Sequence, residues 1–231
     1  MKTVASQSKG WGNSAGYMRA WSLVLLLSLM CAACASTPKT HYYTLRTPPP
    51  PGAVNARTHF VLQVERFDVP DLLRDNRIIF YNSPTELNFH EYHRWSSDPG
   101  ELLSELAMKY FAETGLFQQV YAYPAPVNAD YTLSGRVLDL GEMKYEKGDH
   151  AKSGEARVGL KLDLLQIPEN KVVWSARMEQ TEPIERKNVR AVVDAMNIAA
   201  EHLLQNAYGG ISKVVEQQVA QKQGQEQEQA H

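Results

Sequence analysis

Hydrophobic and polar residues follow two rhythms along the chain, and the first of them predicts strands. Leu160, Leu162 and Leu164, for example, alternate with Lys161 and Asp163, which is the period of a half-buried strand. Similar short runs, several of them bounded by turn residues, occur along much of the chain. The predicted strands span residues 42–45, 60–65, 77–81, 86–95, 117–123, 131–140, 158–164 and 172–178.

A first helix is predicted after the strand 86–95, because apolar residues recur there three and four positions apart. Asp98 is at the N-cap, Pro99 is at the first helical position and Glu101 completes a capping box. Gly115 is typical of a helix end. The predicted apolar stripe consists of Leu102, Leu103, Leu106, Ala107, Tyr110 and Phe111.

A second, longer helix is predicted to begin after Asn188, a favourable N-cap residue. We expect Gly209 and Gly210 to end it and residues 211–219 to form one more helix. Residues 217–231 are rich in Gln and have no apolar stripe beyond Val219, which predicts a disordered tail. The apolar stripe of the long helix consists of Val189, Val192, Val193, Met196, Ala200, Leu203 and Leu204.

The order of the predicted elements is strands, helix, strands, helix, with no internal repeat and no second domain boundary. A sheet that is apolar on one face must be covered by the apolar stripes of the helices. We therefore predict one α+β domain in which helices pack on a mixed, mostly antiparallel sheet.

A short apolar run at residues 23–30 predicts a cleaved signal peptide. The run is too short to span a bilayer, which needs about 20 apolar residues, but it fits the apolar region of a secretory signal. Arg19 is the positive flank, and Met18, directly before it, is an alternative start of translation. The signal peptide is predicted over residues 1–33, with cleavage between Ala33 and Cys34.

Small residues directly before Cys34, behind a short apolar run, resemble a bacterial lipobox. The resemblance implies that Cys34 receives a diacylglyceryl thioether and becomes the first mature residue. Cys31 is the competing site, but it follows the bulky Leu29 and Met30; an ordinary cleaved signal with a free cysteine is the other alternative. Ala35 follows Cys34, and by resemblance to enterobacterial lipoprotein sorting this implies the outer membrane, with the domain in the periplasm.

The mature chain is predicted to have three parts. Residues 34–58 hold the lipid anchor, the first strand and a Pro-rich connector. Residues 59–216 form the domain, and its sheet includes the first strand at 41–46. Residues 217–231 form the tail. Only a few residues separate Cys34 from the first strand, so we expect the domain to lie close to its membrane.

The charge balance and the cysteine count exclude several classes of protein. The chain has 24 Lys and Arg against 26 Asp and Glu, a net charge of −2, and lacks the basic excess of a nucleic-acid-binding domain. Its two cysteines are too few for a disulfide-dense scaffold or a four-cysteine zinc site. Removal of the signal peptide leaves Cys34 as the only cysteine, so the mature fold must rest on its core.

The sequence carries no phosphate loop, dinucleotide fingerprint or G-x-S-x-G elbow. His90 and His93 fall one residue short of the H-E-x-x-H zinc motif, and in a strand their side chains would point to opposite faces. Asp71, Asp75 and Glu86 could supply paired carboxylates for a lipid-anchored hydrolase, although carboxylates are usually just solvated. We predict a protein that is not an enzyme, with no catalytic residue, metal or cofactor.

Arginine and aromatic residues are dense between residues 66 and 95, where they predict a docking surface. Both kinds of residue are enriched at protein–protein interfaces. Core packing with an ordinary surface is an equal alternative. The predicted docking residues are Arg74, Arg77, Tyr81, Tyr92, Arg94 and Trp95.

Several motifs, in order along the chain, resemble the ABC-type transport auxiliary lipoprotein family. They are Y-Y-T-L near the anchor, V-E-R-F-D-V-P-D-L-L-R-D-N-R-I-I-F, H-R-W before the first helix, Y-T-L-S-G-R-V-L-D-L and V-V-D-A-M-N-I-A-A. Together they cover about residues 42–204. The resemblance implies a mixed-sheet fold similar to the N-terminal domain of TolB.

The same resemblance implies a non-enzymatic role in transport. Members of the family are periplasm-facing outer-membrane lipoproteins encoded with an ABC permease or with an MCE-domain protein, whose tunnel moves lipids between membranes. The implied partners are the outer membrane, an MCE-domain protein, ABC transporter subunits and further copies in a ring, with no nucleic acid. The alternative is a structural envelope lipoprotein that stabilises an outer-membrane protein or a peptidoglycan contact.

Overall fold

The computed structural model describes residues 38–48, 58–144 and 154–229. The fold lies in a compact unit, Thr40–His231. The predicted signal peptide, Cys34 and most of the Pro-rich connector lie outside the described residues.

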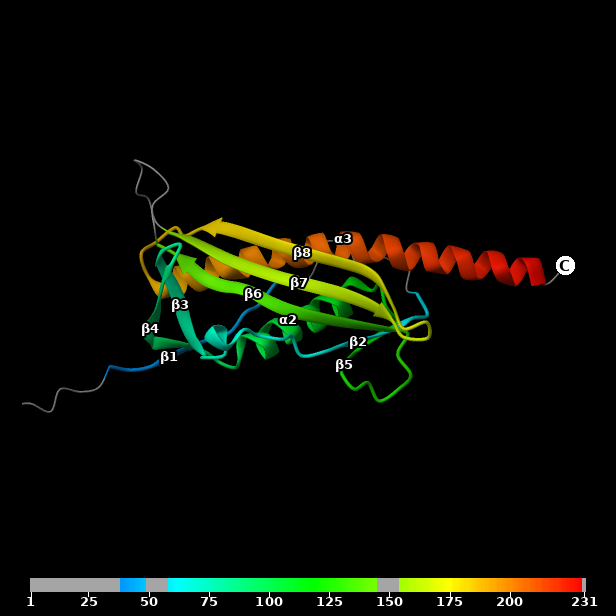
Figure 1. Ribbon diagram of the computed structural model, residues 1–231, viewed down its shortest axis with the longest axis horizontal. Coiled ribbons are helices and arrows are strands. Elements are labelled where there is room, and N and C mark those ends of the chain that lie inside the picture. The colour runs from blue at the N-terminus through cyan, green and yellow to red at the C-terminus, as the bar shows by residue number, and fades with distance from the viewer. Residues whose placement is uncertain (1–37, 49–57, 145–153, 230–231) are drawn as a thin grey trace, which may run out of the picture. The chain divides into compact units, whose positions relative to one another are not determined.

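Strand β6, Tyr131–Met143, is the centre of a mixed sheet (Figure 1). Along one edge it pairs antiparallel with β7, Glu155–Gln166, over nearly its whole length. β7 in turn pairs antiparallel with β8, Lys171–Pro183. These two ladders are the longest in the sheet, so most of the backbone pairing is antiparallel.

The other edge of β6 is shared by two short arms. β2, Val61–Val64, runs parallel to the beginning of β6 and carries β5, Gln119–Ala122, also parallel; we call this pair the β5 arm. β3, Arg77–Ser83, runs parallel to the end of β6. It carries β4, Glu86–Trp95, antiparallel, and β4 carries β1, His41–Tyr43, parallel. These three strands form the β1 arm.

The chain crosses from one arm to the other along the edge of β6. The backbone N–H of Val137 donates to the carbonyl of Asp68 at 2.8 Å, and Asp68 forms a parallel bridge with Arg136. A single helical turn, η1, Asp71–Leu73, follows and leads into β3. The crossing segment therefore fills the edge of β6 that neither arm covers.

Helix α2, Pro99–Thr114, begins and ends where the sequence predicts. The Asp98 carboxylate accepts from the backbone N–H of Gly100 at 2.9 Å and of Glu101 at 3.3 Å. Gly115 ends the helix with a φ of 70°, a left-handed conformation that glycine adopts without steric cost. The predicted N-cap and C-terminal glycine are confirmed.

Helix α3, Val189–Gln229, is longer than predicted. Its predicted cap is confirmed, because the side-chain oxygen of Asn188 accepts from the N–H of Ala191 at 2.9 Å. The helix passes through Gly209 and Gly210 without a break and continues through the Gln-rich segment. The predicted helix break and the predicted disorder of residues 217–229 are therefore wrong.

The physical reason for the long helix differs along its length. Ile211 and Val215, just beyond the glycines, are fully buried, so packing offsets the helix-weakening effect of two glycines. Beyond Val219 the sequence is mostly Gln, Glu, Lys and Ala, all good helix formers. The helix propensity of these residues, rather than an apolar stripe, accounts for the helix in this segment.

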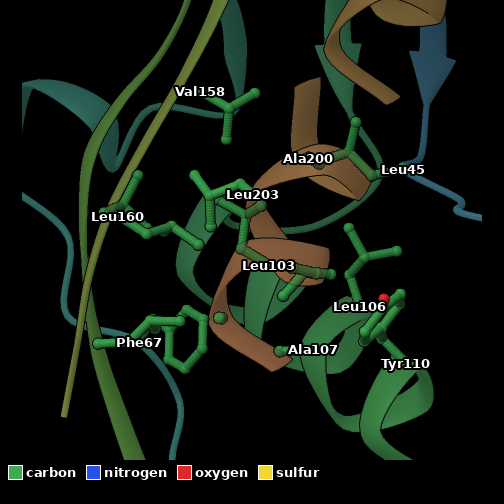
Figure 2. Packing of buried hydrophobic residues seen from close by; sticks show 14 of the residues in the cluster. Leu45, Phe67, Leu103, Leu106, Ala107, Tyr110, Val158, Leu160, Ala200 and Leu203 are labelled. Atoms are coloured by element: carbon green, nitrogen blue, oxygen red, sulfur yellow. The ribbon is translucent and has the colours of Figure 1, made fainter. Parts of the chain in front are cut away.

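The core lies between one face of the sheet and the two helices. Figure 2 shows Leu103, Leu106 and Ala107 of α2 packed near Ala200 and Leu203 of α3. All six residues of the predicted α2 stripe are buried, at 5% exposure or less. In the predicted α3 stripe, Val189 is partly buried and the other six residues are fully buried. With a mixed eight-stranded sheet and two helices in the described residues, the predicted α+β class is confirmed.

The two adjacent glycines of α3 give a matched test of this packing. A Cβ at Gly209 would have no neighbouring atom within 4 Å, whereas a Cβ at Gly210 would overlap the Trp174 indole, with Cε2 at 2.9 Å. Gly209→Ala should raise the free energy of unfolding by about 1 kcal/mol. Gly210→Ala should lower it, because Trp174 must move. Urea unfolding measures both; equal gains for the two variants would contradict the described contact between α3 and β8.

Candidate functional site: the β1 arm

Strand β1 fastens the N-terminal end of the domain into the sheet. Tyr43 pairs with Trp95, and its carbonyl accepts from the N–H of Ser96 at 2.7 Å. Farther along, the N–H of Arg46 donates to the side chain of Asn197 in α3 at 2.7 Å. Leu45 is buried and lies beside Ala200 (Figure 2). From His41 onward the chain is therefore part of the folded domain.

Cys34 and Ala33, the predicted lipidation and cleavage residues, lie outside the described residues. Cys34 precedes His41 by seven residues. A fully extended chain spans at most about 3.3–3.6 Å per residue, so this segment reaches no farther than about 25 Å. A lipid on Cys34 would hold the β1 arm within that distance of the membrane surface.

Two of the predicted docking residues are engaged inside the fold. Trp95 is 1% exposed, so the prediction that it lies on a docking surface is wrong. It ends β4 beside Tyr43, and its backbone N–H donates to the carbonyl of Asn76 at 2.6 Å; a large ring at this position fills the core. Tyr81 is half-buried, and its hydroxyl donates to the Asp139 carboxylate at 3.4 Å.

Arg77 is held by two carboxylates and an aromatic ring. Its guanidinium lies 2.8 Å from Asp75 and 3.3 Å from Glu91. The guanidinium carbon stands 4.0 Å above the centre of the Phe89 ring, a cation–π geometry. The hydrogen bond from Arg77 lowers the pKa of Asp75, and the same bond raises the pKa of Arg77. Both groups therefore stay charged and fixed in position.

The other two predicted arginines lie beside this pair. Arg94 donates to the side-chain oxygen of Asn76 at 2.8 Å and lies 4.0 Å from Asp75. Arg74 lies 3.3 Å from Asp71, and its side chain is 63% exposed. We call Arg74, Arg77 and Arg94 the arginine surface. Their guanidiniums are held in place by neighbours, and such pre-oriented forks suit carboxylate or phosphate groups on a partner.

Tyr92 and Tyr42 are the two exposed large hydrophobic side chains on the described strands of the β1 arm, at 44% and 65% exposure. Tyr42 lies beside Arg94 in the register, and Arg94 lies beside Arg77. The sequence predicts Tyr92 as a docking residue but does not single out Tyr42. Alternation places a strand at Tyr42 but does not say that this strand is the outermost one of its arm.

Three histidines meet on the β1 arm, contrary to the expectation for His90 and His93. Their ring centres are 5.9 Å apart, and His41 stacks on His93 at 5.3 Å. An irregularity in β4 lets the residues between Phe89 and Arg94 oppose a single residue of β3. Such a bulge changes which face a side chain occupies, so the prediction of opposite faces is wrong.

The rings of His90 and His93 form hydrogen bonds with other side chains rather than with each other. Nε2 of His90 lies 2.8 Å from the Glu142 carboxylate, and Nδ1 of His93 lies 2.9 Å from the Tyr43 hydroxyl. Burial, and then the nearby His90 and His41, lower the pKa of His93. Among the described residues, no group of three or more His, Cys, Asp or Glu side chains is arranged to hold a metal ion.

The three carboxylates considered for hydrolysis each have a separate partner. Asp71 pairs with Arg74 and Asp75 pairs with Arg77. Glu86 accepts from the side-chain amides of Asn82 at 2.8 Å and Asn88 at 3.1 Å. Each of the three carboxylates therefore contacts its own polar neighbours.

A different carboxylate, Asp139, lies in a buried position beneath Tyr81. Its side chain is 12% exposed and lies 3.6 Å from the Arg157 guanidinium. Burial raises the pKa of Asp139 to about 6, although the charge of Arg157 acts in the opposite direction. The position lies at a register shift between β6 and β7, where the ladder is locally disrupted.

The described residues contain no helix that is both long enough and apolar enough to cross a bilayer. A family model described as ABC-type transport auxiliary lipoprotein component matches residues 43–207. A comparison with curated protein sequences gives no match. The match begins at Tyr43, the last residue of β1, and includes β3 and β4, which carry Arg77 and Arg94, and most of the helices' buried stripe.

Solved structures share the fold at low sequence identity. Protein XCC0632 from Xanthomonas campestris is 20% identical, with a TM-score of 0.66, over 79% of this chain and 99% of that chain. An uncharacterised protein is 15% identical, with a TM-score of 0.58, over 75% and 99%. The PelC dodecamer from Paraburkholderia phytofirmans is 21% identical over 68% and 92%, and its TM-score of 0.39 is too low to carry an argument.

The pKa of Asp139 predicts how stability depends on pH. Its folded value of about 6 lies above the usual value near 4, so the native state binds more protons between these values. The contribution of Asp139 to the free energy of unfolding is most favourable below about pH 4 and is lost as pH rises through about 6. Asp139→Asn should raise the free energy of unfolding at pH 7.5 by up to about 3 kcal/mol and flatten this dependence.

Urea unfolding from pH 4 to 8 measures the effect. Asp163→Asn is the matched control, because the Asp163 side chain is more exposed, at 27%. Parallel pH curves for the wild type and Asp139→Asn would contradict the raised pKa.

Proposed function

The chain belongs to the ABC-type transport auxiliary lipoprotein family, and we propose that it is a non-enzymatic docking component of an ABC/MCE-type intermembrane lipid transport system. In this proposal Cys34 anchors the protein in the outer membrane, and the domain lies in the periplasm. The arginine surface contacts the MCE-domain protein or an ABC transporter subunit. The protein thereby holds the far end of the transport path at its membrane.

One observation carries the proposal: the entry of the chain and two residues of the arginine surface, Arg77 and Arg94, lie on the same three strands. Tyr42, Arg94 and Arg77 are neighbours across β1, β4 and β3. A pull on β1 is therefore transmitted through the backbone pairing of β1, β4 and β3 to Arg94 and Arg77. Such a connection suits a protein that positions a partner at a fixed distance from a membrane.

The contacts of the arginine surface support a partner with acidic groups. Arg74 has an exposed guanidinium, and Asp71 is its single ion-pair partner among the described residues. An ion pair that loses its water at an interface can contribute affinity. Like charges that face each other across the interface disfavour wrong partners. We expect carboxylates of the partner to face Arg74 and Arg94.

An open sheet edge supports assembly into a ring. β8 has 13 residues and pairs with β7 alone among the described strands. An unpaired edge is a template for pairing with another chain. If β8 of one copy contacts a different edge of the next copy, the contact is head-to-tail and can close into a ring. We propose that copies of the chain assemble in this way around the transport path.

Lipidation is tested by matched cysteine substitutions. Cys34→Ser should abolish incorporation of a clickable fatty acid and leave the precursor uncleaved, because the thioether needs the thiol of Cys34. Cys31→Ser should be labelled and processed like the wild type. Labelling and sucrose-gradient fractionation of the envelope measure both effects. Loss of label from Cys31→Ser instead, or from neither variant, would contradict the assignment.

Docking is tested by changing the exposed Arg74 together with Arg94, which is partly exposed. The double variant Arg74→Glu, Arg94→Gln should reduce the recovery of the MCE-domain protein and ABC subunits at least about tenfold, which corresponds to about 1.4 kcal/mol. Recovery is measured by mass spectrometry after crosslinking and purification of the tagged lipoprotein from envelopes. Crosslinks between copies should include residues of β8.

The control for this experiment is Lys109→Glu, which changes an exposed cation on α2 by the same charge as Arg74→Glu. Unchanged capture by the double variant would contradict the proposed surface. Recovery of a porin or of peptidoglycan fragments, without transport subunits, would favour the structural envelope lipoprotein instead.

A further inference from the structure

Two exposed tyrosines stand where the chain enters the domain. Tyr42 is 65% exposed and Tyr92 is 44% exposed. His41 pairs with His93, so Tyr92 lies beside the point at which the chain enters β1. Tyr42 follows on β1 itself. No described strand covers the outer edge of β1, which ends the order of strands on that side of the sheet.

The length of the segment before β1 limits what can face these tyrosines. Cys34 precedes His41 by seven residues, a reach of at most about 25 Å. If the proposed lipid anchor is present, this reach limits the distance between the bilayer and the start of β1, and the limit is tighter than for any other described strand. The polar layer of a bilayer is itself about 5–8 Å thick on each side.

The chemistry of the two side chains suits that layer. A tyrosine ring has an apolar body and a polar hydroxyl, and tyrosines are enriched at the depth of lipid headgroups for this reason. The hydroxyl of the neighbouring Tyr43, by contrast, hydrogen-bonds His93 inside the arm. Of the tyrosines on β1 and β4, Tyr42 and Tyr92 are therefore the two whose side chains are available to contact an outside surface.

We propose that the β1 arm lies on the headgroup layer of the membrane that holds the anchor, with Tyr42 and Tyr92 as its interfacial contacts. This inference rests on the proposed lipidation of Cys34. In this inference Tyr92 contacts the bilayer rather than a protein partner, and the arginine surface alone contacts the transport partner. The lipid chain and the two rings together orient the domain, whereas the lipid alone would leave it free to rotate.

The β5 arm is the internal reference for this orientation. β2 pairs with the start of β6, up to Leu133, and β3 pairs with its end, from Gly141. Eight residues of extended strand separate these positions, which corresponds to about 26 Å. Tyr123, directly after β5, is 57% exposed. Its exposure lies between those of Tyr42 and Tyr92, so it is a matched tyrosine beside the other arm.

The experiment uses the full lipidated protein in vesicles of phosphatidylethanolamine and phosphatidylglycerol. Tyr42→Cys, Tyr92→Cys and Tyr123→Cys are labelled in turn with a polarity-sensitive fluorophore; the modified Cys34 is the only other cysteine of the mature chain. Nitroxide-headgroup lipids are the quencher. Quenching at positions 42 and 92 should exceed that at position 123 at least threefold, with emission shifted to the blue.

Each other outcome overturns the inference in a recognisable way. Equal quenching at the three positions, or none, in protein that floats with the vesicles would overturn the membrane contact and leave the lipid anchor intact. Protein that does not float lacks the anchor, which would overturn the proposed function and the contact together. Position 92 serves as the second variant if the Tyr42→Cys chain does not fold, and thermal unfolding checks each variant.

Discussion

All pairing in the described sheet depends on β6, because each other strand reaches the sheet through it. β7 and β8 attach along one edge, and the β5 arm and the β1 arm share the other. A strand that is hydrogen-bonded on both edges and buried on one face cannot shift its register without moving its apolar residues out of the core. The positions of both arms are therefore set by one strand and by the two helices packed over it.

In the proposed function, this dependence lets a small domain hold a partner at a fixed position relative to a membrane. β1 has only three residues, yet Leu45 in the core and the bond from Arg46 to Asn197 in α3 extend its hold on the domain. The same arm carries Arg77 and Arg94, and Arg74 lies just before β3; acidic, amide and aromatic neighbours hold these three guanidiniums. Membership of the ABC-type transport auxiliary lipoprotein family and this arrangement both favour a positioning role over catalysis, and the proposed lipid contact of Tyr42 and Tyr92 would fix the orientation as well as the distance.

Local signals in the sequence locate most helices and strands but do not show how these elements contact one another. Alternation located the strands, and Asp98 and Gly115 located α2, because caps and periodicity act within a few residues. The irregularity in β4 has no local signature, so the approach of His90 to His93 could not be predicted. Trp95 was misjudged because an aromatic residue suits a core and an interface equally well. Gly210 is typical of a helix end, but its position beside Trp174 is set by tertiary packing, which the local sequence does not show. Of the predicted site, the arginines could be found from composition, but their pairing with acidic neighbours could not.

From His41 onward the chain belongs to the sheet, and the proposed role of the β1 arm depends on this pairing. Hydrogen–deuterium exchange of the lipidated protein in vesicles measures whether β1 stays paired. Peptides covering residues 41–46 should be protected to the same degree as those from β4, while residues 38–40, which belong to no strand or helix, exchange faster. Exchange of residues 41–46 as fast as that of residues 38–40, with β6 still protected, would contradict this, because β1 would then not be held in the sheet.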